Sequence, residues 1–288
     1  MSTSALIAEA TQTLGLAHVA TPRVDAELLA AFVLGIPRSR LFAAPDLTPG
    51  QMTRFRDLVR ARASRVPVQH LTGTAPFRHR VLQVGPGVFI PRPETELLVD
   101  FGLSFLDSLQ GREARVVDLC SGTGAIATAV ATERPGTRVW AVESYPHALE
   151  WLRRNASGLS VTIVDGDATK PGVLSELDGT VDLVLCNPPY VPEIGASGLP
   201  PEVTEHDPQE AVFGGTDGLD VIRGLIPRIA ALLRPGGVFA LEHDGTHAYV
   251  VPTLVDQDGR FTDVALHHDL ARRPRFTTAT RSGGTLAA

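Results

Sequence analysis

The sequence predicts an α/β protein in which a domain with a mostly parallel sheet follows a small helical domain and a β-hairpin linker. Three observations support this prediction. From Ala114 onward, strand-like and helix-like stretches alternate, which is typical of a parallel sheet covered by helices. Residues 1–75 show only helical spacing, and a stretch rich in Gly and Pro separates the two regions. At 288 residues, the chain is long enough for one large domain and a smaller one.

We expect a helical domain over residues 1–75. Apolar residues recur every three or four positions in TSALIAEATQTLGL and RVDAELLAAFVLG, and Gly15 and Gly35 mark expected helix ends. Thr48 is a plausible N-cap for a third helix that begins at Pro49. The third helix and its end carry five arginines: Arg54, Arg56, Arg60, Arg62 and Arg65. They suit a solvated helix face, or a docking surface for an acidic or RNA-associated partner.

A hairpin linker is expected over residues 76–92. Two short β-like runs, Phe77 to Val84 and Gly87 to Ile90, flank a Gly-Pro-Gly sequence that favours a turn. A helix should begin near Pro93, because Glu94 and Glu96 would then lie in its first turn, where they complement the helix dipole. The remaining domain is expected over residues 93–288.

The alternating pattern of this larger domain defines the expected elements. Strands are expected in ARVVDLC, RVWAVES, SVTIVDGD, VDLVLC, GGVFALEH and RFTTATR. Helices are expected in GAIATAVATER, PHALEWLRRNA and DGLDVIRGLIPRIAALL. The connection over residues 190–218 is long and rich in Pro and Gly, and such connections inside compact domains are usually functional.

Composition excludes several classes of protein. The net charge of −6 disfavours a dedicated nucleic-acid binder, so we expect no stable nucleic-acid partner. Cys120 and Cys186 are too few for a disulfide scaffold and suit a reducing compartment. The first residues lack a basic segment, and Glu9 interrupts their apolar run, so no secretory signal is expected. We find no stretch that suits a membrane span and expect a cytoplasmic protein.

Three candidate ligand-binding groups lie at successive strand ends, where parallel sheets bind their ligands. The first is DLCSGTGAIA, Asp118 to Ala127, in which Gly122 and Gly124 permit a tight turn and close approach of a ligand. The second is Glu143, whose carboxylate can accept hydrogen bonds from ribose hydroxyls. The third is Asp167, where an acid or a neighbouring backbone amide can bind an adenine edge. A single such acid could equally be a loop cap, but three in order indicate a nucleoside-containing cofactor.

The stretch VDLVLCNPPY, residues 181–190, ends a buried strand with an asparagine, two prolines and a tyrosine. An amide or exocyclic amino nitrogen is a poor nucleophile because its lone pair is delocalised. The Asn187 oxygen and the Pro188 carbonyl can each accept one N–H of such a group and direct its lone pair at a methyl donor. Pro188 and Pro189 stiffen the backbone, and Tyr190 can stack on a planar substrate. The motif suits a glutamine amide, an adenine or a guanine.

The strand-end set resembles that of class I S-adenosylmethionine-dependent methyltransferases, with a Rossmann-like domain. FIPRPETELLV, NPPYVP and GGTDGLDVIRGLI resemble the HemK/PrmC family of peptide chain release factor glutamine methyltransferases over nearly the whole chain. The resemblance implies S-adenosylmethionine as cofactor, with S-adenosylhomocysteine as product. It also implies methylation of the glutamine in the Gly-Gly-Gln motif of class 1 release factors. The helical domain would help to bind the release factor, and no metal is implied.

The resemblance also implies roles for individual residues. The catalytic set is Asn187, Pro188, Pro189 and Tyr190. The cofactor-binding set is Asp118, Cys120, Ser121, Gly122, Thr123, Gly124, Glu143, Asp167, Ala168 and Asn187. The substrate-binding set is Arg92, Pro93, Glu94 and Thr95. The chain departs from the family pattern at Ala168, where a large residue is usual, and at His247, where the family has Gln.

Other functions remain open from the sequence alone. A DNA or RNA amino-group methyltransferase would share NPPY, but should add a basic face or a target-recognition domain. A nicotinamide-dependent oxidoreductase would share the glycine pattern, but would give NPPY no role. A catalytically idle binding protein would not need Asn187 together with the intact glycine loop.

Overall fold

The structure is a computed structural model that describes residues 2–109, 111–194 and 198–283. The chain divides into two compact units. The first contains the stretch up to Thr74 together with Val84–Pro86 and Leu199–His206. The second contains Ala75–Gln83, Gly87–Gly198 and the chain from Asp207 onward. The first unit thus includes a short segment of the long connection that follows NPPY.

The first unit is helical. Its elements are α1 (Thr3–Leu16), α2 (Pro22–Leu34), η1 (Arg38–Ala43), α3 (Pro49–Ala63), α4 (Val68–Thr72) and α8 (Pro201–His206). Leu6, Leu14, Leu29 and Phe55 are almost completely buried in its core. The expected cap of α3 is confirmed, because the Thr48 side chain accepts from the Gln51 amide while the Gln51 side chain accepts from the Thr48 amide.

An ion-pair network in this unit involves two of the five arginines. Arg62 is buried and contacts Asp25, also buried, at 2.7 Å, and its guanidinium reaches Glu202 of α8 at 2.7 Å. Arg65 donates to the same glutamate through Nε at 2.9 Å. Although burial opposes the shift, hydrogen bonds from Arg65 and Arg62 lower the pKa of Glu202 to about 2. Both expectations for the arginine run, a solvated face or a docking surface, are therefore wrong for Arg62 and Arg65. These two side chains form ion pairs within the unit.

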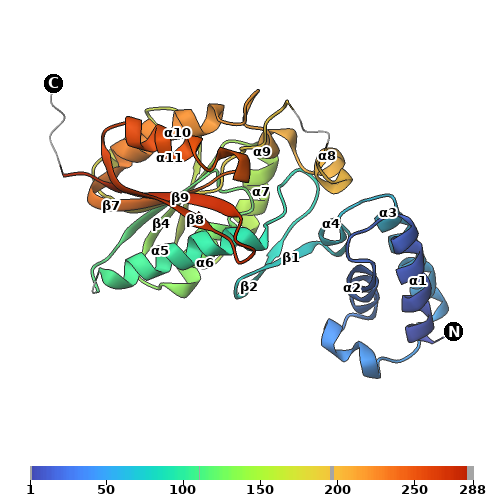
Figure 1. Ribbon diagram of the computed structural model, residues 1–288. Coiled ribbons are helices and arrows are strands. Elements are labelled where there is room, and N and C mark those ends of the chain that lie inside the picture. Colours follow the sequence, from blue (N-terminus) through green and yellow to red (C-terminus); the bar gives the residue numbers. More distant parts are fainter. Residues whose placement is uncertain (1, 110, 195–197, 284–288) are drawn as a thin grey trace. The chain divides into compact units, whose positions relative to one another are not determined.

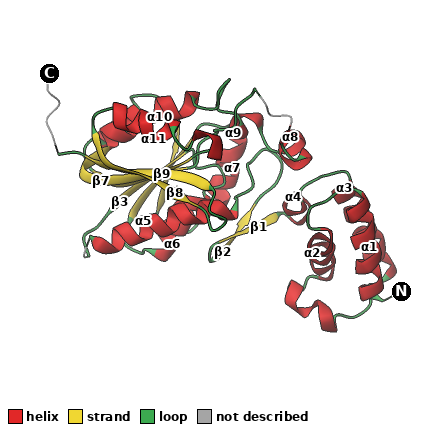
Figure 2. Ribbon diagram, in the orientation of Figure 1, coloured by secondary structure: helices red, strands yellow, loops and turns green. Residues whose placement is uncertain are grey.

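The second unit is built on a seven-stranded sheet in the order β5-β4-β3-β6-β7-β9-β8. The strands are β3 (Arg115–Leu119), β4 (Arg138–Glu143), β5 (Val161–Asp165), β6 (Val181–Cys186), β7 (Leu233–Glu242), β8 (Phe261–His268) and β9 (Pro274–Arg281). The first five strands in this order are parallel, and β9 runs antiparallel to both β7 and β8. The predicted mostly parallel α/β fold is therefore confirmed (Figures 1 and 2).

Helices cover both faces of this sheet, as Figure 1 shows for α5 and α6 below it and α10 and α11 above it. The bounds of the covering helices are α5 (Glu96–Ser108), α6 (Ala125–Glu133), α7 (Pro146–Asn155), α10 (Asp220–Leu232) and α11 (Val250–Gln257). Strand β6 is buried along its whole length. Its alternate residues face opposite layers: Leu183 and Leu185 pack in the core with α5 and α6, and Val184 packs in the core with α10 and α11.

The hairpin lies earlier than the sequence predicts. It consists of β1 (Thr74–Phe77) and β2 (Arg80–Gln83), with Arg78 and His79 in the turn, so the expected pairing across Gly-Pro-Gly is wrong. Val88 and Ile90 are buried without forming a strand. Gly87 has a φ of +87°, and a Cβ there would lie 2.9 Å from His147 Cβ. The apolar residues of this run are thus buried without strand pairing, and Gly87 lies close to His147 of α7. Apolar spacing alone does not distinguish such a buried loop from a strand.

The remaining described elements connect these layers. They are the 3₁₀ turns η2 (Pro93–Thr95), η3 (Ser175–Leu177) and η5 (Gly245–His247), together with the short helix α9 (Gln209–Val212). Among the residues that the structure describes, we find no helix with the length and apolar character that a membrane crossing requires.

Candidate active site

The glycine loop and NPPY follow two neighbouring strands. Leu119 ends β3 and pairs in register with Cys186, which ends β6. The chain proceeds from β3 through α6 to β4 on one side, whereas β6 lies on the other side of β3. This is the switch point of the sheet, where loops diverge and leave room for a ligand. The sequence-predicted cofactor loop and the catalytic motif therefore lie next to each other.

Backbone geometry shapes the glycine loop. Gly122 and Gly124 have φ values of +55° and +79°, which glycine adopts without a steric penalty. A Cβ at Gly124 would lie 2.5 Å from Leu152 Cδ1, whereas a Cβ at Gly122 would meet nothing within 4 Å. Gly124 is therefore needed for packing against α7, and Gly122 leaves open space beside the first turn of α6. Such a position suits a ligand that approaches the backbone closely.

Asp118 lies beneath this loop and is completely buried. Its Oδ2 accepts from the Ala127 amide at 3.0 Å, and its Oδ1 has no hydrogen-bond partner among the described residues. Burial raises the pKa of Asp118 to about 7. A buried carboxyl oxygen without a partner is costly, so this atom is a candidate acceptor for a polar group of a ligand.

Glu143 ends β4 and ties that strand to the glycine loop. Its Oε2 accepts from the Gly122 amide at 2.8 Å, and its Oε1 accepts from the Ser144 and Tyr145 amides at 2.8 and 2.7 Å. Three amides hold the carboxylate in one orientation. A carboxylate has about four acceptor positions, so capacity remains for a hydroxyl donor.

Asp167 lies two residues beyond the end of β5, not at the strand end itself. Its Oδ1 accepts from the Thr169 amide at 2.9 Å and from the Thr169 hydroxyl at 2.6 Å. Lys170 lies 3.6 Å from Oδ2. The side chain is thus engaged as a local cap, and Ala168 beside it is buried. Adenine recognition here stays a prediction.

The Asn187 side chain lies in a hydrogen-bond network that joins three segments. Its Nδ2 donates to the Thr95 hydroxyl at 3.0 Å, and that hydroxyl donates to Glu242 Oε2 at 2.8 Å. Tyr190 donates its phenolic hydroxyl to Glu242 Oε1 at 2.9 Å. Asn187 and Tyr190 follow β6, Thr95 ends η2, and Glu242 ends β7. The network brings catalytic and substrate-binding residues of the sequence prediction together around one unpredicted carboxylate.

Glu242 is the main residue that sequence reasoning missed. It is completely buried, and burial raises its pKa to about 7 although hydrogen bonds from Thr95 and Tyr190 oppose the shift. Burial also raises the pKa of Tyr190 well above its usual range, so its hydroxyl keeps its proton. Glu242 is the last but one residue of the predicted strand GGVFALEH, and an acid near the carboxyl end of that strand was the available signal.

The connection after NPPY packs against the motif's own backbone. The Val191 amide donates to the Val212 carbonyl at 2.9 Å, and the Gly214 amide donates back to the Val191 carbonyl at 3.0 Å. A Cβ at Gly218 would lie 2.4 Å from the Tyr190 carbonyl oxygen. His247 Nε2 lies 2.9 Å from the carbonyl oxygen of Asp217 in the same connection. The glycines of GGTDG therefore permit a close approach that fixes the NPPY backbone.

Arg92 is paired with a residue in the middle of this connection. Its guanidinium contacts Asp207 at 2.6 Å and lies over the Phe89 ring at 4.7 Å. Burial raises the pKa of Asp207 to about 6, although the charge of Arg92 opposes the shift. Pro93 and Glu94 form η2 with Thr95, whose buried hydroxyl is already engaged. Direct contact of these residues with substrate stays a prediction.

The two cysteines lie at the ends of neighbouring strands: Cys120 follows β3, and Cys186 is the last residue of β6. Both are free, Cys186 is buried, and Cys120 is partly buried with a φ of +60°. Burial raises the pKa of Cys186 well above its usual range, and a hydrogen bond with Cys120 adds to the effect. The Cys186 thiol is therefore a poor nucleophile, and its place in the core is a packing role.

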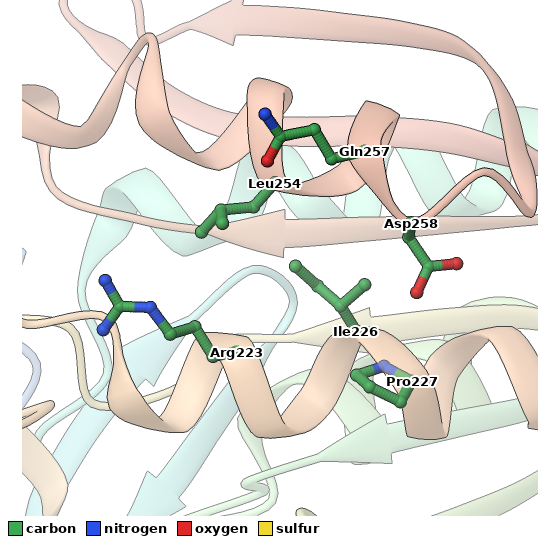
Figure 3. Close-up of a pocket in the computed structure, with 6 residues that line it drawn as sticks. All are labelled: Arg223, Ile226, Pro227, Leu254, Gln257 and Asp258. Atoms are coloured by element: carbon green, nitrogen blue, oxygen red, sulfur yellow. The ribbon is translucent and has the colours of Figure 1, made fainter.

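A cavity of about 240 Å³ lies elsewhere, between α10 and α11 (Figure 3). Its lining consists of Arg223, Ile226, Pro227, Leu254, Gln257 and Asp258. None of the sequence-predicted site residues contributes to this lining. The cavity therefore has no part in the site at the strand ends.

Known proteins share both units of the chain. Residues 5–73 match the family model of the PrmC N-terminal domain, and residues 65–197 match that of the methyltransferase small domain. The release factor glutamine methyltransferase of Mycolicibacterium smegmatis is 54% identical over 275 residues and covers 96% of each chain. That of Streptomyces coelicolor is 46% identical and covers 96% of this chain and 97% of its own. The chain belongs to the release factor glutamine methyltransferase family. The resemblance inferred from the sequence is confirmed.

A solved structure supports the fold independently. The catalytic domain of hMettl16, in complex with an RNA hairpin, aligns with 80% of this chain and 94% of its own at a TM-score of 0.55. The identity is only 13%, so this likeness shows the fold alone.

As a member of the family, the protein is a methyltransferase that uses S-adenosylmethionine. The residues at the strand ends fit that cofactor. The open space at Gly122 suits close approach of the methionine part, and the unpartnered Asp118 Oδ1 can accept from its ammonium group. The remaining acceptor capacity of Glu143 suits ribose hydroxyls.

Proposed function

We propose that this methyltransferase modifies the side-chain amide nitrogen of a glutamine in peptide chain release factors. The glutamine of the Gly-Gly-Gln motif is the acceptor that the family resemblance implies. The relatives at 54% and 46% identity carry the name release factor glutamine methyltransferase. The structural observation that supports the proposal is the state of Asn187. Its Nδ2 is engaged by Thr95, and its Oδ1 has no protein partner among the described residues.

The reaction needs an amide nitrogen held in one orientation. When bound, S-adenosylmethionine supplies an electrophilic methyl group. Asn187 Oδ1 and the Pro188 carbonyl each accept one N–H of the glutamine amide, which directs the nitrogen lone pair along the line of attack. The glutamine nitrogen gains the methyl group and releases one proton, and S-adenosylhomocysteine remains as the coproduct.

No strong base is required for methyl transfer, because the proton leaves the glutamine nitrogen after the transfer. The rate of the reaction therefore depends on the preorganised orientation of the two acceptors. Pro188 and Pro189 lack N–H groups that would compete for the carbonyl acceptors. Packing of the following connection on the NPPY backbone keeps the acceptors in place before substrate binds. Acceptors that are already oriented need no reorganisation in the transition state.

We also propose that residues 1–75 form a substrate-recognition domain. A tripeptide offers few contacts, and binding energy from remote contacts helps to align the reacting atoms. Arg62 and Arg65 are paired internally, but Arg54 and Arg56 of the helical unit are exposed and available for this task. A cytoplasmic location follows from the proposed substrate, because release factors act on ribosomes.

The deciding experiment supplies radiolabelled S-adenosylmethionine together with a release factor, an adenine-containing DNA or ribosomal RNA. Label should enter the release factor, and replacement of its Gly-Gly-Gln glutamine by alanine should abolish incorporation. Label in nucleic acid with none in the release factor would instead establish the alternative, an exocyclic amino-group methyltransferase.

A further inference from the structure

The proposed chemistry requires one of two orientations of a nearly symmetric side chain. The oxygen and nitrogen ends of the Asn187 carboxamide have similar size, so shape alone does not distinguish them. With its oxygen toward the substrate, Asn187 accepts an N–H. With its NH₂ toward the substrate, Asn187 would place a hydrogen-bond donor against the N–H of the substrate amide, which is also a donor. A further group must therefore select the orientation.

Proton counting in the network identifies that group. Ionised Glu242 has acceptors only, whereas the Thr95 hydroxyl has one proton and two lone pairs. Thr95 gives its proton to Glu242 Oε2 at 2.8 Å, so it presents a lone pair to Asn187. Only the NH₂ end of the carboxamide can satisfy that lone pair, and it does so at 3.0 Å. Asn187 Oδ1 is then turned away from Thr95.

The other side of Glu242 reinforces this arrangement. Tyr190 fills Oε1 with its own hydroxyl proton, so each carboxylate oxygen has a hydroxyl donor. Glu242 is 1% exposed and Thr95 is 3% exposed, which leaves little access for water to replace a partner. Buried, fully satisfied polar networks specify one arrangement because each alternative leaves a group unpaired.

We propose that Glu242 is a positioning residue that holds the Asn187 carboxamide, through the Thr95 hydroxyl, with its oxygen toward the acceptor amide. The hydrogen bonds of the network are observed in the structure. The statement that the Asn187 oxygen faces a glutamine amide rests on the proposed function. Glu242 touches neither reactant in this scheme and acts only through Thr95. Thr95 likewise orients the catalytic asparagine.

The kinetic test removes one hydroxyl. Thr95→Val keeps the side-chain shape and should lower kcat on release factor about 10- to 100-fold, because a preorganised contact is lost. The KM for S-adenosylmethionine should change less than about threefold, since this variant removes no proposed cofactor contact. Thr95→Ser keeps the hydroxyl and should recover most of the loss. Thr278→Val is the matched control, because it removes another buried hydroxyl, bonded to His267 at 2.8 Å, and should retain kcat.

A second test reads the asparagine directly and needs no substrate. The chain has two asparagines, Asn155 and Asn187, so the full-length protein labelled with [¹⁵N]asparagine gives two side-chain amide signals. Asn187→Ala assigns them. Thr95→Val and Glu242→Gln should shift the Asn187 signal, since a glutamine at 242 cannot accept from both hydroxyls. The Asn155 signal should stay, because its amide donates to the carbonyls of Gln83 and Thr123.

The outcomes separate this proposal from the proposed function. A lowered kcat with a shifted Asn187 signal supports the positioning role. An unshifted Asn187 signal in both Thr95→Val and Glu242→Gln overturns it, whatever happens to kcat. If the unmodified enzyme leaves release factor unlabelled, the proposed function fails, while the amide signals still decide whether Glu242 orients Asn187.

Discussion

Tyr190 donates its phenolic hydroxyl to Oε1 of Glu242 at 2.9 Å, which links the catalytic motif to the end of the neighbouring strand. Besides Tyr190 and Thr95, two charged groups act on this carboxyl: Arg275 of β9 lowers its pKa and Glu94 of η2 raises it. Burial outweighs the favourable contacts, and the pKa of Glu242 is about 7. The residue thus titrates within the range in which enzymes are commonly assayed.

Activity should rise with pH through about 7. Below this pKa, Glu242 is protonated and can donate to Thr95, which releases the Thr95 proton toward Asn187 and permits the unproductive amide orientation. The kcat profile of the wild-type enzyme should therefore show an acid limb. Glu242→Gln cannot ionise and should lack that limb. Identical acid limbs in the two enzymes would assign the titration to another group.

Stability should change with pH in the opposite direction. Asp118 and Glu242 have pKa values of about 7 in the folded state, above the ordinary values of 3.8 and 4.5. Between those limits the folded state binds more protons than the unfolded state, so its free energy of unfolding falls as pH rises toward 7. Urea unfolding at pH 5.5 and 7.5 measures the effect. The slope should decrease in Glu242→Gln, and an unchanged slope would show that Glu242 is not responsible.

Asn187→Ala tests the catalytic asparagine. Loss of the carbonyl acceptor should lower kcat about 10²- to 10³-fold, as loss of one preorganised contact does in other active sites. Binding of S-adenosylhomocysteine should change only a few-fold, because the proposed cofactor contacts come mainly from β3 and β4. Single-turnover methylation and calorimetric titration measure the two effects. Near-normal turnover on release factor would contradict the mechanism.

Glu143→Gln tests the proposed ribose site. A carboxamide has one oxygen, so its NH₂ must face either the Gly122 amide or the amides of Ser144 and Tyr145. Affinity for S-adenosylhomocysteine should fall by roughly 1.5–3 kcal/mol, as expected for a hydrogen bond to a charged group. The same experiment on Asp165→Asn, one strand further along, controls for loss of a strand-end charge. Equal dissociation constants for Glu143→Gln and the wild type would place ribose elsewhere.

Local signals predicted most of the fold. Thr48 was identified as an N-cap because a cap and its helix are adjacent in sequence. Strand β6 was identified by its run of mostly apolar residues, which the structure shows to be buried along its whole length. The parallel core followed from alternation alone. Strand β8 and helix α11 were missed, because β8 is an edge strand in which polar residues interrupt the apolar pattern. Tertiary context decides such segments, and periodicity does not.

The sequence predicted only those residues of the site that lie at or just after the end of a strand. Gly122, Glu143 and Asn187 are each marked by their position after an apolar run. The role of Glu242 depends instead on Thr95, 147 positions earlier in the chain. Whether Asp167 caps its own turn depends on its rotamer, which no sequence pattern specifies. Contacts of this kind are properties of the packed structure.

The final prediction concerns the arginines of the helical unit, which differ in their surroundings. Arg62 is 5% exposed and pairs with Asp25, so Arg62→Ala leaves a buried carboxylate without its partner. Breaking such a pair should destabilise the unit by about 3–5 kcal/mol. Arg56 is exposed, so Arg56→Ala is the matched control and should change stability by less than about 0.5 kcal/mol.

The measurement must report on the helical unit alone. Both tryptophans and all three tyrosines belong to the other unit, so their fluorescence is unsuitable. Hydrogen exchange of peptides from α1 and α2, followed by mass spectrometry on the full-length protein, provides a local measure of opening free energy. Arg62→Ala should accelerate exchange in both helices, and Arg56→Ala should not. Equal protection in the two variants would show that the buried ion pair does not stabilise the unit, and Arg62 would return to the candidates for binding release factor.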